Sequence, residues 1–352
     1  MSTLVNAPSL KEQWIQFRKD NPRVRIRDAA KQLKTTEASI LASFAGSSVM
    51  RLQPDWAALL DAAGKLGYVM SLTRNEYCVH ERKGVFENID CSNKFAGLVV
   101  GPDIDLRMFY TVWKFAFAVL DDELAGFKSS LQIFDGQGNA VIKIFLTEKS
   151  NVQAFQQLVR DFSLPVQETG LELLPPPAAP QYKDGSVDVE AFRADWAALK
   201  DTHDFFPLLK KYGVSRLHAL EIAGTFATKV DNNATRELLE TASREKWEIM
   251  VFVGNRGNIQ IHTGPVEKIV EIPGWINVMD PIFNLHLKLD AIHSSWLVKK
   301  PTVDGTIHSL EVFDAAGEMI VQFFGKRKPG IPELDNWREG IQSIAGRLAL
   351  KN

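Results

Sequence analysis

The sequence predicts an α+β fold written twice in tandem, each half being a large antiparallel β-sheet with flanking α-helices. Three observations lead to this prediction. A strand–turn–strand pattern recurs 179 residues apart, a proline-rich segment separates the two occurrences, and helical periodicity gives way to alternating periodicity within the second half. Helices followed by runs of strands are typical of α+β proteins.

The recurring pattern is a pair of β-hairpins. Residues 127–146 read FKSSLQIFDGQGNAVIKIFL, and residues 306–325 read TIHSLEVFDAAGEMIVQFFG. Each joins two strands of alternating apolar residues through a turn that contains Asp and Gly. The positions in register include Ser130/Ser309, Leu131/Leu310, Phe134/Phe313, Asp135/Asp314 and Gly138/Gly317. Weaker similarity links Trp14–Gly46 to Trp196–Gly224, so the chain is expected to be a tandem duplication rather than a solenoid.

The boundary between the two copies is expected at the segment Leu174–Pro180, which reads LPPPAAP. Proline cannot continue a helix or enter a central strand, and a proline-rich spacer is stiff and extended. We therefore predict an N-terminal repeat at 1–164, a linker at 165–187 and a C-terminal repeat at 188–352. A chain of 352 residues is long enough for two domains.

In the second repeat, short helices precede the strands. Residues 189–200 place their apolar side chains on one helical face, Thr202 can cap a following helix, Gly213 can end it, and Ser215 can start another. Alternating segments then predict strands at 249–253, 258–262, 268–272, 275–279, 283–288 and 294–298. A last helix is expected at 332–350.

Composition excludes several classes of protein. The 41 basic and 43 acidic residues give a net charge of -2, which argues against a strongly basic nucleic-acid-binding chain. Two cysteines are too few for a disulfide framework. No apolar run approaches the roughly 20 residues that cross a bilayer, and residues 1–11 lack the apolar segment of a secretory signal. We expect a cytoplasmic protein without membrane insertion.

Common catalytic motifs do not occur in the sequence. We find no phosphate-binding loop, no His-Glu-x-x-His, no Gly-x-Ser-x-Gly and no zinc-type cluster. No flavin or nicotinamide fingerprint can be named either. Readings as a hydrolase or a nucleotide-hydrolysing enzyme therefore have no support.

His203 is the first candidate site residue, because it lies at the expected start of a helix beside Phe205 and Phe206. A flat apolar ligand with a metal centre would use one such imidazole together with aromatic walls. The alternative is a histidine that only caps or packs the helix start.

Arg107 is the second candidate. If residues 104–109 form a strand, Ile104, Leu106 and Met108 share one face, and Arg107 projects from the other with Asp105 and Phe109. An arginine beside an aromatic ring suits carboxylate binding through its two-pronged guanidinium. The alternative is an exposed arginine paired with Asp105.

The segment from Arg23 to Gly46 offers a different function, because it resembles a basic helix-turn-helix. Such a unit can enter the major groove of DNA. The alternative is a pair of small helices that cover a sheet edge. The equivalent segment of the second repeat lacks the basic residues, which argues against a nucleic-acid partner.

Several segments, in order along nearly the whole chain, resemble the cytoplasmic haemin-handling family that includes HemS, ChuS, PhuS and HmuS. They are Asn21–Asp28 (NPRVRIRD), Asp105–Phe109 (DLRMF), Thr202–Phe206 (THDFF), Trp275–Pro281 (WINVMDP), Phe283–Leu287 (FNLHL) and Lys300–Gly305 (KPTVDG).

This resemblance implies two structural repeats and one haem in a cleft between a second-half helix and first-half sheet residues. It implies that His203 is the axial ligand of the haem iron and that Arg107 is a distal, catalytic arginine. Phe109 and Phe206 would cover the porphyrin, and Lys326 or Arg327 would contact its propionates. Asp201 or Asp204 would orient the His203 ring.

For function, the resemblance implies a protein that accepts imported haem. It would then either open the ring with an external reductant, releasing iron, or pass the haem on for degradation. A pure carrier is the alternative. The expected partners are haem, the cytoplasmic face of a haem importer, and a haem oxygenase or external reductase, with the protein a monomer or a dimer.

Overall fold

The computed structural model describes residues 8–328 and 330–350, and the chain forms two compact units. The first consists of residues up to Arg74, Glu81–Pro177 and Asn255–Ile259, and the second of Asn75–His80, Ala178–Gly254 and residues from Gln260 onward. The chain passes between units at Pro177, inside the predicted linker. The predicted repeat limits, 1–164 and 188–352, stay a prediction, and their residues 1–7, 329 and 351–352 lie outside the described residues.

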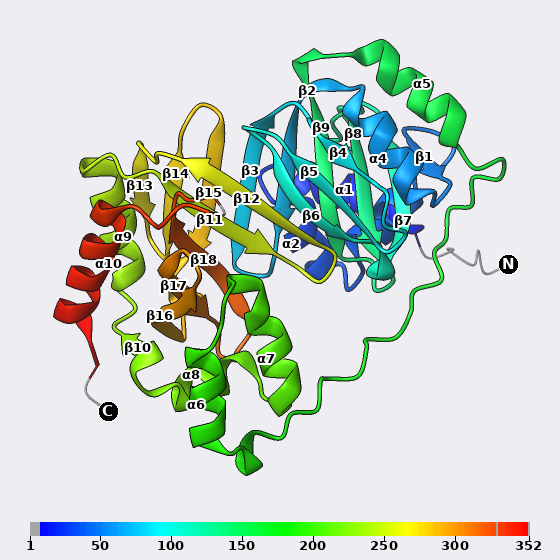
Figure 1. The fold of residues 1–352 in the computed structure, drawn as a ribbon. Coiled ribbons are helices and arrows are strands. Elements are labelled where there is room, and N and C mark those ends of the chain that lie inside the picture. Colours follow the sequence, from blue (N-terminus) through cyan, green and yellow to red (C-terminus); the bar gives the residue numbers. More distant parts are fainter. Residues whose placement is uncertain (1–7, 329, 351–352) are drawn as a thin grey trace, which may run out of the picture. The chain divides into compact units, whose positions relative to one another are not determined.

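The first unit begins with three short helices and continues mostly with strands (Figure 1). Its elements are α1 (Leu10–Asp20), α2 (Ile26–Gln32), α3 (Glu37–Ala42), β1 (Val49–Leu52), α4 (Trp56–Gly64), β2 (Gly67–Arg74), β3 (Cys78–Gly84), β4 (Ile89–Asp90), β5 (Ala96–Val100), β6 (Asp105–Phe109), the 3₁₀ helix η1 (Tyr110–Val112), β7 (Trp113–Val119), β8 (Ser130–Asp135), β9 (Ala140–Ser150) and α5 (Val152–Phe162). Antiparallel pairing gives the order β1–β7–β8–β9–β2, and β4, β5 and β6 pair in sequence.

Both faces of the sheet in the first unit are covered, because successive residues of a strand point to opposite faces. On β7, Phe117 and Val119 pack with helices α1–α3, whereas Ala116 and Ala118 pack with α4 and α5. The coverage of both faces explains why every residue of β8 is buried, including the polar ones.

The second unit repeats this plan. The elements that lie wholly or partly in it are η2 (Asp184–Ser186), α6 (Val189–Ala197), η3 (Thr202–Asp204), α7 (Phe205–Tyr212), α8 (Arg216–Ile222), η4 (Gly224–Phe226), β10 (Ala227–Val230), α9 (Ala234–Arg244), β11 (Ile249–Gly254), β12 (Asn258–Gly264), β13 (Ile269–Ile272), β14 (Trp275–Met279), β15 (Phe283–Lys288), η5 (Leu289–Ala291), β16 (Ser294–Thr302), β17 (Gly305–Phe313), β18 (Met319–Gly325) and α10 (Asp335–Leu348). The antiparallel order is β10–β16–β17–β18–β11, and β13, β14 and β15 pair in sequence. β3 and β12 each contain residues of both units.

Two groups of helices flank this sheet (Figure 1). Helices α6–α8 pack with Trp296, Val298 and Phe313, whereas α9 and α10 pack with Leu297 and Val312. The strands thus alternate between two apolar cores, which explains the two-residue period of the sequence. The 3₁₀ helix η3, directly before α7, carries the candidate residue His203.

The duplication predicted from the hairpins extends into the helices. Helices α2 and α7 start at equivalent positions, Ile26 and Phe205, and each is followed by a residue of positive φ, Lys34 (52°) and Gly213 (65°). Thr36 and Ser215 then cap α3 and α8 in the same way. The predicted α+β class and duplication are confirmed.

The structure differs from the predicted elements at several places. Helix α9 was not predicted, and β16 continues to Thr302 instead of ending at 298. Asp201, not Thr202, caps the turn that precedes α7. Helix α6 ends at Ala197 rather than at 200. The last helix starts at Asp335 rather than at Pro332, because the Glu333 carboxylate accepts hydrogen bonds from the backbone and the ring of His308.

Each unit takes in a hairpin tip from the other half of the sequence, and one asparagine fixes each tip. In the second unit, the Asn75 amide donates to the carbonyls of Gly254 (3.2 Å) and Ile320 (2.7 Å). In the first unit, the Asn255 amide donates to the carbonyls of Arg74 (3.0 Å) and Val141 (2.8 Å). The same asparagine hydrogen bonds therefore occur at the equivalent hairpin tip of each copy.

Candidate functional site

His203 lies in a short turn that its two acidic neighbours build. The Asp201 carboxylate accepts a hydrogen bond from the His203 backbone N–H (2.8 Å), and the Asp204 carboxylate accepts one from the Asp201 N–H (3.0 Å). This reciprocal cap satisfies N–H groups that a helix start leaves unpaired. It presents the imidazole to the surface, where the side chain is 91% exposed.

Asp201 also orients the imidazole. Its Oδ1 lies 2.6 Å from Nδ1 of His203. The His203 backbone N–H is the main cause that lowers the pKa of Asp201, and the ring of His203 and Arg327 act in the same direction. An ionised carboxylate can only accept, so the neutral ring carries its proton on Nδ1 and its lone pair on Nε2. Among the described residues, nothing forms a hydrogen bond with that Nε2.

Two exposed apolar side chains lie on segments that adjoin the His203 loop. Phe206 follows in α7 and is 71% exposed, and Val303, in the β16–β17 turn, is 78% exposed. The Val303 N–H donates to the carbonyl of Lys200 (2.9 Å), which fixes this turn beside the His203 loop. Phe205, expected from the sequence to face a ligand, is instead buried against Trp196, with ring centroids 4.6 Å apart.

The two cationic candidates of the second repeat have different surroundings. Arg327 Nη2 lies 3.8 Å from Asp304, and its charge acts on Asp201, so the fold brings Arg327 close to the His203 loop. Lys326 instead donates to Glu248 (2.7 Å). The sequence carried no signal for the role of Asp304, which reaches Arg327 from a different turn.

The first unit carries Arg107 and Phe109 on β6, where Leu106 and Met108 are buried and the alternate residues are not. Arg107 forms an ion pair with Asp105, and its Nη1 donates to the carbonyl of Leu106 (3.1 Å). Burial raises the pKa of Asp105, and Arg107 acts in the opposite direction. The pairing with Asp105 that the sequence offered as the alternative is therefore present.

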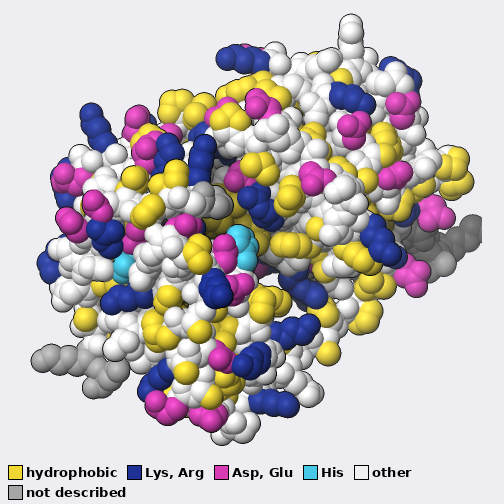
Figure 2. Space-filling model, viewed as in Figure 1, with side chains coloured by type: hydrophobic (Ala, Val, Ile, Leu, Met, Phe, Trp, Pro, Cys, Tyr) yellow, Lys and Arg dark blue, Asp and Glu magenta, His cyan; other side chains and the backbone are white. Residues whose placement is uncertain are grey.

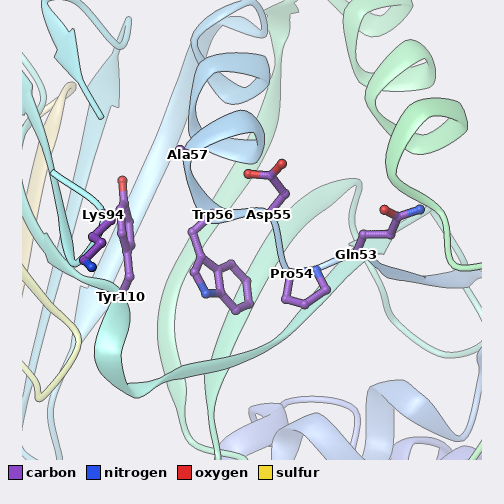
Figure 3. A pocket seen from close by; sticks show the side chains of 7 residues that line it. All are labelled: Gln53, Pro54, Asp55, Trp56, Ala57, Lys94 and Tyr110. Atoms are coloured by element: carbon purple, nitrogen blue, oxygen red, sulfur yellow. The ribbon is translucent and has the colours of Figure 1, made fainter. Parts of the chain in front are cut away.

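A hollow of about 500 Å³ opens next to this strand in the first unit. It is lined by Gln53, Pro54, Asp55, Trp56, Ala57, Lys94 and Tyr110. Figure 3 shows Lys94 and Tyr110 at one side of the view, Gln53 at the other and Trp56 between them. The Tyr110 hydroxyl donates to Cys91 Sγ (3.8 Å), and burial raises the pKa of Tyr110. The candidates Arg107 and Phe109 are not among its lining residues.

The basic helix-turn-helix segment forms α2 and α3, and both are covering helices. Ala29, Ala30, Ile40 and Leu41 are buried in the core beneath them. The helices pack on a face of the sheet, against Phe117 and Val119, rather than on the sheet edge that the sequence offered as the alternative to DNA binding. On the face drawn in Figure 2, basic and acidic side chains are interspersed.

Comparison with known proteins identifies the family. The family model described as the haemin-degrading HemS.ChuX domain matches residues 34–162 and again residues 213–344. This chain belongs to that family. The two matches fall in the two halves of the duplication, as the hairpin register predicts.

Three relatives are similar over nearly their whole length. The hemin transport protein HmuS of Yersinia pestis is 39% identical, over 96% of this chain and 98% of HmuS. The holo form of PhuS, a heme-binding protein from Pseudomonas aeruginosa, has a TM-score of 0.93 and 48% identity, over 97% of this chain and 99% of PhuS. ChuS, an E. coli heme oxygenase, has a TM-score of 0.85 and 34% identity, over 95% and 99%.

The described residues contain neither a membrane-spanning helix nor a cluster of metal-binding side chains. No helix there is long and apolar enough to span a membrane. No group of three or more His, Cys, Asp or Glu side chains there could hold a metal ion.

Proposed function

We propose that this protein binds haem through His203 and handles it as the cargo or substrate of haemin utilisation. The observation that carries the proposal is the His203 ring itself. It is exposed, its Nδ1 is held by Asp201, and Phe206, three residues later, is exposed as well. The relatives support it, because PhuS is described as heme-binding and HmuS as a hemin transport protein.

The chemistry of this arrangement suits haem iron. An imidazole whose second nitrogen donates to a carboxylate is fixed in one tautomer and is a more basic ligand. Exposed apolar side chains next to it gain roughly 25 cal/mol per Å² when a porphyrin covers them. Phe206 and Val303 supply such surface beside His203.

For the propionates we propose Arg327 ahead of Lys326. The Arg327 side chain is 13% exposed, and its Nε has no hydrogen-bond partner among the described residues. A buried guanidinium with an unused donor is suited to a carboxylate ligand. Lys326, by contrast, already pairs with Glu248.

Haemin titration of the purified full-length chain tests the proposal. We expect a Soret band that saturates at one equivalent of haemin, and a His203→Ala variant with a weakened or shifted band. His293→Ala is the matched control, because His293 is also exposed in the second unit. A wild-type chain without a Soret band, or equal spectra for His203→Ala and His293→Ala, would overturn the assignment.

Degradation of the bound haem is a second proposed function, favoured by the similarity to the heme oxygenase ChuS. Ring opening consumes O₂ and electrons, which an external reductant would supply. The test adds ascorbate to the haem complex with catalase present, so that free peroxide is removed. Loss of the Soret band with a linear tetrapyrrole product supports an enzyme, and an unchanged complex supports a carrier.

Arg107 and Phe109 belong to this second function as predictions. If Arg107 acts on haem during ring opening, Arg107→Leu should keep haem binding but lower the ring-opening rate by about 100-fold. Phe109→Ala should shift the Soret band. Lys114→Leu is the control, because it removes an exposed cation of the same unit. Equal rates for Arg107→Leu and Lys114→Leu would remove Arg107 from the reaction.

We also propose the cytoplasm as the working compartment. Both cysteines are thiols rather than halves of a disulfide, as is usual in a reducing compartment. A haem importer's cytoplasmic face and a haem oxygenase or reductase are the proposed partners. Cell fractionation followed by crosslinking in the haem-loaded state would test compartment and partners together, and recovery outside the cytoplasm would contradict the first.

A further inference from the structure

A buried cluster of three charged groups lies in the second unit. Glu311 of β17 is fully buried and accepts two hydrogen bonds from Arg216, at its Nε (2.8 Å) and Nη2 (2.7 Å). Lys300 of β16 donates to the same carboxylate from Nζ (2.7 Å) and is 3% exposed. The cluster therefore holds two cations against one anion.

Such a cluster is a poor device for stability alone. Burying charges carries a large desolvation cost, and apolar residues of the same volume often serve as well or better. The cluster is therefore expected to act by holding neighbouring groups in place. Both cations of the cluster contact an aromatic ring next to the His203 loop.

That ring is Phe205. Arg216 Cζ lies 4.9 Å and Lys300 Nζ 4.7 Å from its centroid, so two cations contact one buried ring. Phe205 is the first residue of α7, and its backbone N–H donates to the carbonyl of Thr202. The position of the ring is therefore tied to the point where the turn that carries His203 ends and α7 begins.

Strand β16 and the residue that follows it also hold the segment that leads into this turn. Before it, Trp196 Nε1 donates to the carbonyl of Lys299 (2.9 Å), and the Val303 N–H donates to the carbonyl of Lys200 (2.9 Å). Lys300 lies between these two anchor points on the strand. The His203 turn is thus tied to one strand at its entry, and at its exit to the Phe205 ring that Lys300 contacts.

The first unit provides an internal comparison. At the duplication spacing, Glu37 corresponds to Arg216, Gln132 to Glu311 and Gln322 to Lys143. The first unit buries an ion pair between Glu37 and Lys143, so at this place its helix supplies the acid and its strand the base. The charges are reversed between the two copies.

The equivalents of Phe205 and His203 are Ile26 and Val24. The first copy therefore has neither a histidine nor an aromatic ring at these two positions, and Asp121 stands at the position of Lys300. The cation–ring arrangement occurs in the copy that carries the exposed imidazole.

We infer that Arg216, Lys300 and Glu311 form a positioning cluster that fixes His203 as a haem ligand by holding the ring of Phe205. This inference rests on the proposed role of His203. The three residues do not touch haem in this proposal; they determine how well one imidazole orientation is kept.

The test uses the haem-loaded full-length chain and two independent variants. Phe205→Leu removes the ring but keeps apolar volume, and Arg216→Gln removes one cation at a side chain that is 27% exposed. Each should raise the rate of haem transfer to excess apomyoglobin by about tenfold, as the loss of a ligand-supporting group does in metal sites. Each should also alter the spin state of the ferric complex. Phe205→Tyr and Arg216→Lys should restore both readouts.

The matched control is Glu37→Gln with Lys143→Met, which removes the buried pair of the first unit. Its transfer rate and spin state should equal those of the wild type even if its melting temperature falls. If Phe205→Leu does not fold, Arg216→Gln decides. A folded variant with wild-type transfer rate and spin state, or a control that changes them equally, overturns the inference.

A measurement without haem separates this inference from the proposed function. In the haem-free chain, the ¹⁵N shifts of the His203 ring report its hydrogen bond to Asp201. Phe205→Leu should broaden or average these signals, and Glu37→Gln with Lys143→Met should not. If the wild type fails to bind haem, the proposed function falls. Unchanged ring signals in Phe205→Leu contradict the positioning role whether or not haem binds.

Discussion

The carboxylate of Asp201 lies 2.6 Å from Nδ1 of His203, and the same carboxylate accepts the His203 backbone N–H at 2.8 Å. One acid therefore fixes both the backbone and the ring of the candidate ligand. A ring held in this way needs little further ordering when its Nε2 binds a metal, which favours tight coordination.

Replacing this acid should weaken haem binding more than it weakens the fold. Asp201→Asn keeps a side-chain acceptor for the backbone cap but removes the charge that supports the imidazole. We expect haem affinity to fall by about 10- to 100-fold. Competition for haemin with apomyoglobin measures the change.

The control for this prediction is Asp204→Asn, because Asp204 contacts the backbone of the loop and not the ring. Its haem affinity should stay within about threefold of the wild type, the range of an exposed charge pair. Equal losses in the two variants would mean that the acids only support the turn.

Arg327 should recognise the haem carboxylates. Arg327→Gln is expected to weaken haemin binding by about tenfold at low salt and less at high salt, because salt screens partly exposed charges. Haemin dimethyl ester has no free propionates, so its affinity should be nearly the same for variant and wild type. If Arg327→Gln weakens the binding of the ester as much as the binding of haemin, Arg327 acts through Asp201 and not on the propionates. Lys326→Gln should have the smaller effect on haemin.

The ion pairs of Glu311 should make the stability of the second unit sensitive to acid. Burial alone would raise its pKa, but Arg216 and Lys300 outweigh burial and hold the pKa of this carboxyl well below its ordinary value of 4.5. When the pKa of a carboxyl is lower in the folded state than in the unfolded state, its ionised form stabilises the fold. This stabilisation is fully present above the unfolded-state pKa and is lost as the pH falls toward the folded-state pKa. Acidification below 4.5 should therefore weaken the second unit.

Glu311→Gln isolates this contribution. At pH 7 we expect the variant to lose about 3–5 kcal/mol of unfolding free energy, because the buried Lys300 and the partly buried Arg216 lose their anion. The gap between wild type and variant should narrow as the pH falls from about 5 to about 3. Urea unfolding followed by tryptophan fluorescence measures it, and a gap that does not change with pH would refute the coupling.

The sequence predicted the sheets well because strand periodicity is a local signal. Phe117 and Ala118, or Trp296 and Leu297, alternate between two cores, and that alternation is visible in the sequence. The duplication was also predictable, because its hairpin turns keep Asp and Gly at fixed spacing. These features depend on neighbours within a few residues.

Features that depend on distant partners could not be predicted. Glu311 occupies a strand position where a charge is expected at the surface, and its burial is possible only because Arg216 arrives from a helix 95 residues away. The position of the helix cap, by contrast, could have been predicted as Asp201 instead of Thr202. Asp201 has an acid three residues later, the spacing of a reciprocal cap, and Thr202 does not.

The two asparagines at the hairpin tips should be essential to the fold. Besides the carbonyls that its amide bonds, Asn255 accepts from the N–H groups of Gly257 (2.9 Å) and Asn258 (3.0 Å) through its Oδ1. Asn75 accepts in the same way from Tyr77 (3.1 Å) and Cys78 (2.9 Å). Truncation leaves several partly buried backbone groups without these bonds.

We therefore expect Asn75→Ala and Asn255→Ala each to cost at least about 1–3 kcal/mol. Asn75→Ala should affect the second unit and Asn255→Ala the first, which hydrogen exchange of the two sheets can distinguish. Asn336→Ala is the control, because its side chain is exposed and bonds only the next residue's N–H. Because the tips belong to different units, the double variant should lose the sum of the two single losses if the units unfold independently, and a departure from additivity would measure the coupling between them.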